Sequence, residues 1–186
     1  DHICFAIGDV SGKGVPAALF TAVTRTMLKS LINKETPLDK SMFRLNNELC
    51  QGNDACMFTT LFCGILNIRT GEIVYSNAGH NFPYVYRKDG SLEAVTSANS
   101  VALGCMEEIP YSKGKITLTK GDALILYTDG VSEAMNHLQE LFTEKRLETA
   151  IRKCTGTSSQ EIVTNVMNDI AAFVAGAEQS DDITLL

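Results

Sequence analysis

Short apolar runs separated by glycine-containing turns fill the middle of this chain, and they constrain its fold more than any other feature. The runs are predicted strands, and they lie at residues 58–68, 73–78, 84–87, 92–96, 116–119 and 123–128. The short links between them carry turn-forming residues, at 69–71, 89–90 and 120–122. Such links favour antiparallel hairpins, because a parallel crossover needs a dozen or more residues.

Helical periodicity and two further apolar runs flank this region. Helices are predicted over 15–32, from Thr36-Pro37 onward, near 144–154 and over 159–175. In the second helix Thr36 is the expected cap and Pro37 the first residue, and an inner face is expected at Leu38, Met42, Leu45 and Leu49. The last helix opens with a capping-box pattern at 158–161 and is expected to end near Gly176. Residues 3–8 are predicted to form a buried strand, and 183–186 a final strand.

Helices grouped between runs of hairpin-linked strands favour an α+β fold, with sheets packed together and helices outside. A length of 186 residues predicts one domain over residues 1–186. The chain starts at Asp1, without an initiator Met, and passes directly into a strand-like run. It is therefore expected to be a piece of a longer protein.

Composition excludes several classes of protein. The net charge of −6 argues against nucleic acid binding, because phosphates favour a basic surface. No apolar run is long enough to cross a bilayer, so this domain is not expected to contact a membrane. The six cysteines contain no C-x-x-C pair, and most lie in apolar segments. Reduced, cytoplasmic cysteines fit better than a zinc site or a disulfide framework.

Three aspartates share one local pattern, because each lies where an apolar strand ends or begins. Asp9 and Asp129 follow such runs, and Asp181 precedes the last one. If the three carboxylates converge, they repel one another unless a cation compensates. Oxygen ligands without His or Cys suit hard ions such as Mg²⁺ or Mn²⁺, and two such ions can activate a water for attack on phosphorus. Scattered turn aspartates are the alternative interpretation.

Other candidate residues have simpler interpretations. The segment from Gly8 to Gly14 lacks the spacing and the Ser or Thr of a phosphate-binding P-loop. Ser11 has no histidine relay nearby, so a turn or cap role is favoured over nucleophilic catalysis. Lys13 is equally compatible with attracting phosphate and with a solvated loop. For His80 a structural role in a loop is favoured over proton transfer or substrate contact.

Four motifs along the chain resemble those of one known family in order and spacing. They are GDVSGKGVPAA at 8–18, NAGHN at 77–81, LYTDGVSEA at 126–134 and DDIT at 181–184. Together they resemble the SpoIIE-type bacterial phosphatases, which belong to the PPM (type 2C-like, metal-dependent) serine/threonine protein phosphatases. The similarity covers essentially the whole chain. It implies an α-β-β-α sandwich, in which two mainly antiparallel sheets are flanked by helices.

The resemblance also implies a site with two Mn²⁺ or Mg²⁺ ions. Asp9 would bridge both ions, and Val10 would offer its backbone carbonyl. Asp129 and Asp181 would complete the shell of one ion, and Asp182 ranks below Asp181 as a direct ligand. These aspartates are thus the expected catalytic residues. The nucleophile would be a water molecule activated by the metals, and not a side chain.

The implied substrate is a phosphoserine or phosphothreonine on a protein, such as an anti-sigma-factor antagonist of the STAS type. An upstream sensor or receiver domain and a homodimer are the other expected partners. One feature departs from the family: an earlier Gly-Gly-Asp motif, whose aspartate joins the metal site, is not present in this sequence, so N-terminal strands are expected to be missing. The alternative is therefore a weakly active or inactive module that binds a phosphoprotein or dimerises. Hydrolysis of a small phosphorylated metabolite is a third possibility.

Overall fold

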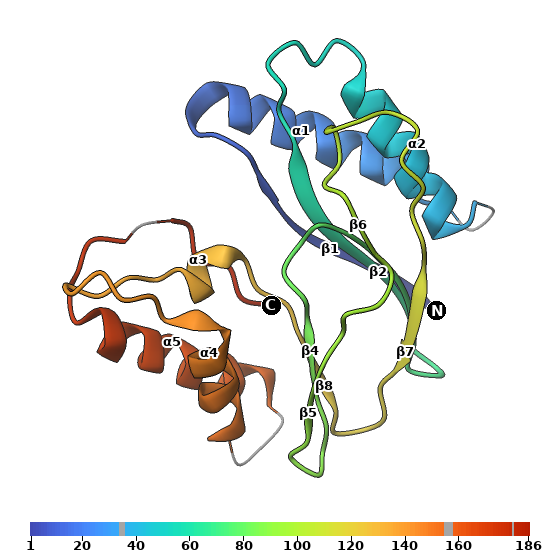
Figure 1. Cartoon of the computed structure of the whole chain (residues 1–186). Helices are drawn as coiled ribbons and strands as arrows, with labels where there is room; N and C mark the ends of the chain where they lie inside the picture. The colour runs from blue at the N-terminus through green and yellow to red at the C-terminus, as the bar shows by residue number, and fades with distance from the viewer. Residues whose placement is uncertain (34–35, 155–157, 180) are drawn as a thin grey trace. The chain divides into compact units, whose positions relative to one another are not determined.

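The computed structural model describes residues 1–33, 36–154, 158–179 and 181–186 (Figure 1). The chain forms two compact units. The first unit comprises Asp1–His80 and Ser97–Thr117, and the second unit comprises Asn81–Thr96 and Leu118–Leu186. The expectation of one domain over residues 1–186 stays a prediction.

The first unit contains a five-stranded sheet. Its strands are β1 (His2–Val10), β2 (Thr59–Asn67), β3 (Glu72–Ala78), β6 (Asn99–Ser100) and β7 (Gly114–Thr117). The strand order is β1-β2-β3-β6, and β7 also pairs with β3. Every pairing is antiparallel except that of β3 with β6. The predicted hairpin between β2 and β3 is confirmed, and its turn closes with a 2.9 Å hydrogen bond from the N–H of Gly71 to the carbonyl of Asn67.

Two helices, α1 (Gly14–Leu31) and α2 (Leu38–Cys50), accompany this sheet. The predicted inner face of α2 is confirmed, since its four apolar residues are all buried. They pack with Leu61 and Leu103 in the core of this unit. The predicted cap at Thr36 is wrong. Pro37 is the residue before the helix, and its carbonyl accepts the N–H groups of Lys40 and Ser41 at 3.0 Å each.

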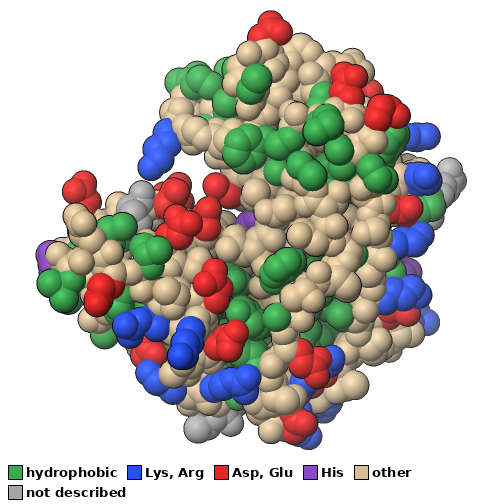
Figure 2. Space-filling view, viewed as in Figure 1, with side chains coloured by type: hydrophobic (Ala, Val, Ile, Leu, Met, Phe, Trp, Pro, Cys, Tyr) green, Lys and Arg blue, Asp and Glu red, His purple; other side chains and the backbone are tan. Residues whose placement is uncertain are grey.

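Two predictions about the start of the chain need correction. Strand β1 was expected to be buried, but Ile7 is the only buried one of its nine residues. The physical reason is that β1 is an edge strand, paired only with β2 among the described residues. On α1, the helical apolar pattern over residues 15–32 implies an inner face, but two residues of that pattern, Leu19 and Val23, are 62% and 44% exposed. Figure 2 shows hydrophobic side chains at the surface in the region of this helix.

The second unit contains a three-stranded antiparallel sheet and three helices. The strands are β4 (Tyr84–Tyr86), β5 (Leu92–Ala94) and β8 (Ala123–Ile125), in the order β5-β4-β8. The helices are α3 (Asp129–Ser132), α4 (Thr143–Arg152) and α5 (Ser159–Val174). The predicted hairpin between β4 and β5 is confirmed. The four-residue helix α3 and the two-residue strand β6 of the first unit are too short for a periodic pattern, and the sequence did not predict them.

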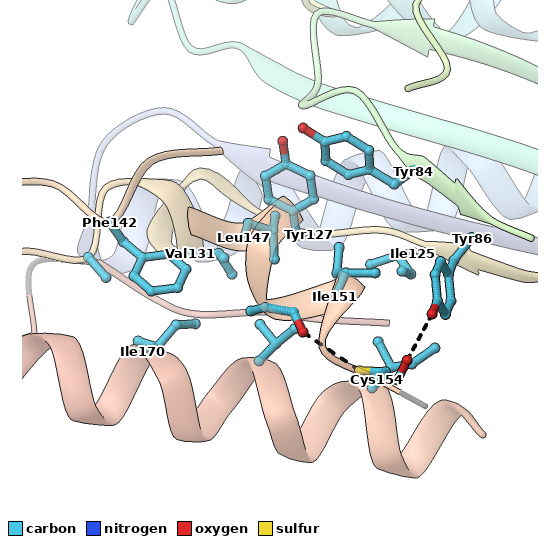
Figure 3. Packing of buried hydrophobic residues seen from close by; sticks show 14 residues of the cluster. Tyr84, Tyr86, Ile125, Tyr127, Val131, Phe142, Leu147, Ile151, Cys154 and Ile170 are labelled. Carbon is cyan, nitrogen blue, oxygen red and sulfur yellow. Dashed lines mark hydrogen bonds between the residues drawn. The ribbon is translucent and has the colours of Figure 1, made fainter. Parts of the chain in front are cut away.

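Aromatic side chains organise the core of the second unit (Figure 3). The rings of Tyr84 and Tyr127 stack with centroids 6.0 Å apart. The hydroxyl of Tyr86 donates a 2.9 Å hydrogen bond to the carbonyl of Cys154, two residues after the end of α4. The sheet and the helix are therefore linked by a buried polar contact as well as by apolar packing.

The link at residues 120–122 does not form the expected hairpin. Strand β7 pairs with β3, and β8 pairs with β4, so the two strands that this link joins belong to different sheets. The local turn nevertheless forms, since the N–H of Asp122 donates to the carbonyl of Thr119 at 3.0 Å. A turn signal thus predicted the bend correctly and the strand pairing wrongly.

The end of the chain differs from the prediction in two ways. Ser158 precedes α5, but its side chain makes no capping hydrogen bond, so the capping box does not form as expected. The helix ends as predicted, because Ala175 and Gly176 both adopt positive φ angles. Residues 183–186 do not form a regular strand. Within them, Leu185 makes an isolated antiparallel bridge with Tyr127.

The overall fold class is confirmed as α+β, with two mainly antiparallel sheets and helices. All six cysteines are free, and Cys63 and Cys154 are the two buried ones. Among the described residues, none of the helices combines the length and the apolarity needed to span a bilayer.

Candidate functional site

Asp9 lies near the end of β1, where hydroxyl groups of β2 hold its backbone. Its N–H donates to Oγ1 of Thr60 at 3.3 Å, and its carbonyl accepts a 2.8 Å hydrogen bond from Oγ1 of Thr59. The Asp9 side chain is exposed at this end of the sheet, and Val10, opposite Thr59 in the register, is half-buried. The backbone around the first predicted ligand is therefore fixed by two threonines.

Gly8 lets β1 approach β2 closely, and Ser11 holds the turn that follows the strand. At Gly8 a Cβ atom would lie 2.5 Å from the carbonyl oxygen of Thr60, so this position needs glycine for close strand approach. Ser11 closes the turn, because its N–H donates to the carbonyl of Phe58 and its Oγ accepts the N–H of Phe58, both at 2.9 Å. This agrees with the interpretation of Ser11 as a turn residue.

His80 takes part in the network that holds Asp9. Its Nδ1 lies 2.9 Å from Oγ1 of Thr60, the hydroxyl that contacts the backbone of Asp9. Asn77 fixes the backbone of His80 twice: Oδ1 accepts the N–H at 2.8 Å and Nδ2 donates to the carbonyl at 2.9 Å. His80 and Asn77 are 4% and 0% exposed. The contacts agree with the predicted structural role of His80 in a loop.

In the second unit Asp129 is the first residue of α3, directly after Thr128. The Thr128 hydroxyl donates to the carbonyl of Asp182 at 3.1 Å and accepts the N–H of Thr184 at 3.0 Å. The N–H of Thr128 also donates to the carbonyl of Thr184 at 3.1 Å. These three bonds join the segment that carries Asp129 to the segment that carries Asp181, although more than fifty residues separate the two in sequence.

Gly130 allows these two segments to approach closely. A Cβ atom at this position would collide with the backbone carbonyl of Asp182. Asp181 and Asp182 are exposed, and Oδ1 of Asp181 accepts the N–H of Asp182 at 2.8 Å. The backbone of Asp182 serves the contact with Thr128, so Thr128 and Gly130 shape the turn around Asp129.

Buried phenols lie beside this turn. Burial raises the pKa of Tyr127 to about 12, and the charge of Glu144 acts in the same direction. Burial likewise raises the pKa of Tyr84, whose hydroxyl donates to Oε1 of Glu148 at 3.0 Å. Both phenols therefore stay protonated at neutral pH and act as hydrogen-bond donors, not as bases.

The predicted ligands are distributed over both units. Asp9 and Val10 belong to the first unit, whereas Asp129 and Asp181 belong to the second unit. Within either unit, the described residues contain no group of three or more His, Cys, Asp or Glu side chains that could hold a metal ion. The ligand assignment therefore stays a prediction. Carboxylates on two adjoining segments, joined through Thr128, do fit the oxygen donor set of a hard divalent cation.

Four residues whose side chains hydrogen-bond to the segments of the candidate site were not singled out from the sequence as positioning residues. They are Thr59, Thr60, Thr184 and Asn77. Each lies within or next to an apolar strand, where threonine is common for reasons of strand propensity alone. Only Asn77, an amide inside an apolar run, is an unusual residue at its position.

The sequence matches the family described as Stage II sporulation protein E (SpoIIE) over residues 1–186. The chain belongs to the SpoIIE family. Among curated relatives of this SpoIIE-family chain, Phosphoserine phosphatase RsbU of Bacillus subtilis is 29% identical over 187 residues, which cover 100% of the chain and 55% of RsbU. Protein IcfG of Synechocystis sp. is 27% identical over 214 residues, which cover 100% of the chain and 33% of IcfG. The chain thus spans only about a third to a half of these two relatives.

Solved structures confirm the fold. The RsbU and RsbW domains of Rv1364c from Mycobacterium tuberculosis match with a TM-score of 0.80 at 24% identity, over 100% of this chain and 52% of that one. The PP2C phosphatase domain of SpoIIE from Bacillus subtilis, solved with a fragment of its regulatory domain, matches with a TM-score of 0.81 at 19% identity. That match covers 99% of this chain and 53% of the other. The SpoIIE-family chain therefore has the fold of PP2C phosphatase domains.

Proposed function

We propose that this chain is a metal-dependent protein phosphatase that hydrolyses phosphoserine or phosphothreonine. The observation that carries the proposal is the contact of Thr128 with Asp182 and Thr184, which brings the segments of Asp129 and Asp181 together. Family membership supports it, and RsbU and RsbP of Bacillus subtilis are both named phosphoserine phosphatases. Two structures of similar fold are described with metals, RsbX with magnesium and PstP with two manganese ions.

The proposed ligands are the carboxylates of Asp9, Asp129 and Asp181 and the backbone carbonyl of Val10. Two Mg²⁺ or Mn²⁺ ions, when bound, would supply positive charge for the phosphoryl group and lower the pKa of a water. The residues of the chain hold the ligands in place: Thr59 and Thr60 fix the backbone of Asp9, and Thr128 fixes the backbone after Asp181. No side chain is required as a nucleophile in this proposal.

The proposed substrate is a phosphorylated regulatory protein, with a STAS-type anti-sigma-factor antagonist as the first candidate. The support is the family and the names of the relatives, one of which is solved with both an RsbU and an RsbW domain. A sensor or receiver domain elsewhere in the protein is the proposed regulator. A panel of phosphopeptides and small phosphorylated metabolites separates protein phosphatase from metabolite phosphatase activity.

The test measures phosphate release from a phosphoserine peptide in Mn²⁺, with wild type, Asp9→Asn and Asp129→Asn. We expect each substitution to lower kcat/KM at least a hundredfold, because an amide is a poorer ligand for a hard cation than a carboxylate. Asp54→Asn and Asp89→Asn are matched controls on exposed turns of the two units, and they should keep full activity. Unchanged activity in Asp9→Asn or Asp129→Asn would refute the assignment.

The same measurement decides the alternative of a regulatory module. Tight binding of a phosphoprotein without any phosphate release, in saturating Mn²⁺ or Mg²⁺, would favour a module that binds or dimerises. Calorimetric titration of Mn²⁺ adds an independent readout, since a purely regulatory module has no need for two metal sites.

A further inference from the structure

Three neighbouring strand ends bring Asp9, Thr60 and His80 together in the first unit. Asp9 of β1 is directly opposite Thr60 of β2, so the two side chains share a face of the sheet. On the other side of β2, Ala78 at the end of β3 is opposite Leu61, and His80 follows two residues later. The register therefore places His80 next to Thr60, across β2 from Asp9.

His80 makes the shortest contact of the Thr60 hydroxyl. Its Nδ1 lies 2.9 Å from Oγ1 of Thr60, whereas the contacts of this hydroxyl with the backbone of Asp9 are 3.3 Å to the nitrogen and 3.4 Å to the carbonyl oxygen. Hydrogen bonds of such groups are best at about 2.7–3.0 Å and weaken as they lengthen. The contact with His80 thus anchors the hydroxyl, and the longer contacts with Asp9 depend on where the hydroxyl is anchored.

His80 is itself held from two sides. Asn77 accepts the N–H of His80 on Oδ1 at 2.8 Å and donates from Nδ2 to its carbonyl at 2.9 Å. Both side chains are buried. Because a buried ring on a fixed backbone has few rotamers open to it, Nδ1 can hold the Thr60 hydroxyl in one orientation.

The backbone of Asp9 is where these contacts end. Its carbonyl also accepts the Thr59 hydroxyl at 2.8 Å, so two threonines of β2 hold one peptide segment. Asp9 supplies a proposed carboxylate ligand, and the next residue, Val10, supplies a proposed carbonyl ligand. Residues that orient metal ligands through hydrogen bonds typically change metal affinity about ten- to hundredfold when they are replaced.

We infer that His80 is a positioning residue for metal binding: it orients the hydroxyl of Thr60, which in turn orients the backbone of the proposed ligand Asp9. The inference rests on the proposed function, because it needs Asp9 to hold a divalent cation. In this role His80 neither binds the metal nor transfers a proton. Its contribution is the direction of one hydrogen bond.

The test is calorimetric titration of Mn²⁺ into the chain of residues 1–186, which measures the Kd of the wild type and of variants at one fixed pH. His80→Leu removes the ring nitrogen and Thr60→Val removes the hydroxyl, and we expect each to raise the Kd roughly ten- to hundredfold. His80→Asn should retain most of the affinity, because its amide is attached at the same side-chain atom as Nδ1 and can donate or accept. His2→Leu is the matched control, an exposed histidine at the other end of β1, and it should leave the Kd unchanged.

A double variant separates a positioning role from general support of the fold. If His80 acts through Thr60, the combination of His80→Leu with Thr60→Val raises the Kd no further than either substitution alone. A merely structural role would lower the free energy of unfolding, which urea denaturation measures, and would leave the Kd of the folded variants unchanged. Wild-type affinity in a folded His80→Leu variant, equal losses in the Leu and Asn variants, or additive effects in the double variant would overturn the inference. Should His80→Leu fail to fold, an unchanged Kd in Thr60→Val would overturn it.

Asp9→Asn distinguishes a failure of this inference from a failure of the proposed function. If the wild type binds Mn²⁺ and Asp9→Asn abolishes the binding, the metal assignment stands, and the variants of His80 and Thr60 test the inference alone. A wild type that does not bind Mn²⁺, or an Asp9→Asn variant that binds it as the wild type does, would overturn the proposed ligand and the inference with it.

Discussion

The hydroxyl groups of Thr60 and Thr128 each join segments that are far apart in sequence. Thr60 contacts the backbone of Asp9 and the ring of His80, and Thr128 contacts Asp182 and Thr184. A threonine hydroxyl can donate one hydrogen bond and accept others, which suits it to hold two backbone segments at once. At the scale of single residues, threonines position the backbone beside the predicted carboxylate ligands.

Replacement of Thr128 tests this role. Thr128→Val keeps the shape but leaves the carbonyl of Asp182 and the N–H of Thr184 without the hydroxyl, so we expect a loss of about 1–3 kcal/mol in the free energy of unfolding. Urea denaturation measures the loss. Thr128→Ser, which keeps the hydroxyl, should lose less than half as much. Equal stability of the Val and Ser variants would show that these bonds contribute nothing.

Asn77 is the second residue whose removal should be costly. Asn77→Ala abolishes both bonds to the backbone of His80 at a fully buried position, and we expect a destabilisation of roughly 2–4 kcal/mol. Thermal or urea unfolding measures it. Asn168→Ala on the exposed surface of α5 is the control, and it should change stability by only a few tenths of a kcal/mol. A similar effect of the two substitutions would argue against the Asn77 network.

At the scale of elements, the turn before β8 depends on one carboxylate. Asp122 accepts hydrogen bonds from the N–H of Thr119 at 2.9 Å and of Lys88 at 3.0 Å, and Arg87 lies 3.1 Å away. These contacts, led by the Thr119 N–H, lower the pKa of Asp122 to about 2. The turn thus brings together the β4–β5 hairpin and the start of β8 through a buried charge.

The sign of the resulting pH effect follows from the lowered pKa. The ionised form is favoured in the folded state, so Asp122 contributes stability above its ordinary pKa of 3.8 and loses it as the pH falls toward 2. We expect the difference in unfolding free energy between wild type and Asp122→Asn to be constant above pH 5 and to shrink between pH 4 and pH 2. Urea denaturation over that range checks it. A difference that does not depend on pH would remove the carboxylate from the explanation.

At the scale of the whole molecule, the proposed metal ligands are drawn from both units. Any ligand that binds the folded chain alone stabilises it, by about 2.7 kcal/mol when its concentration is a hundred times the Kd. Because a chain of this size shifts its Tm by roughly 2–4 °C per kcal/mol, Mn²⁺ should raise the Tm by about 5–10 °C.

The variants make this shift diagnostic. Asp9→Asn in the first unit and Asp129→Asn in the second unit should each abolish most of the Mn²⁺-dependent rise in Tm. The Asp54→Asn control should show the full rise. Scanning fluorimetry with and without Mn²⁺ gives the comparison. A wild type whose Tm does not respond to Mn²⁺ or Mg²⁺ would count against the proposed metal dependence.

Local patterns in the sequence determined most of the elements. The apolar spacing of α2 predicted its buried face, and the turn residues at 69–71 and 89–90 predicted two hairpins. The four motifs predicted the family, which the match over residues 1–186 confirms. These features depend on residues that are close in the chain, so propensity and periodicity are sufficient to find them.

Only the tertiary structure decided which strands pair and which faces are buried. The bend at residues 120–122 joins strands of two different sheets, β6 runs parallel to β3, and β1 is an exposed edge. The contacts of Thr128 with Asp182 and Thr184 likewise span more than fifty residues. Which strands pair depends on the packing of segments that are distant in the chain. Local hydrogen-bonding and turn preferences contain no information about that packing. The sequence therefore determined most of the elements and the family, and the fold decided how the elements meet.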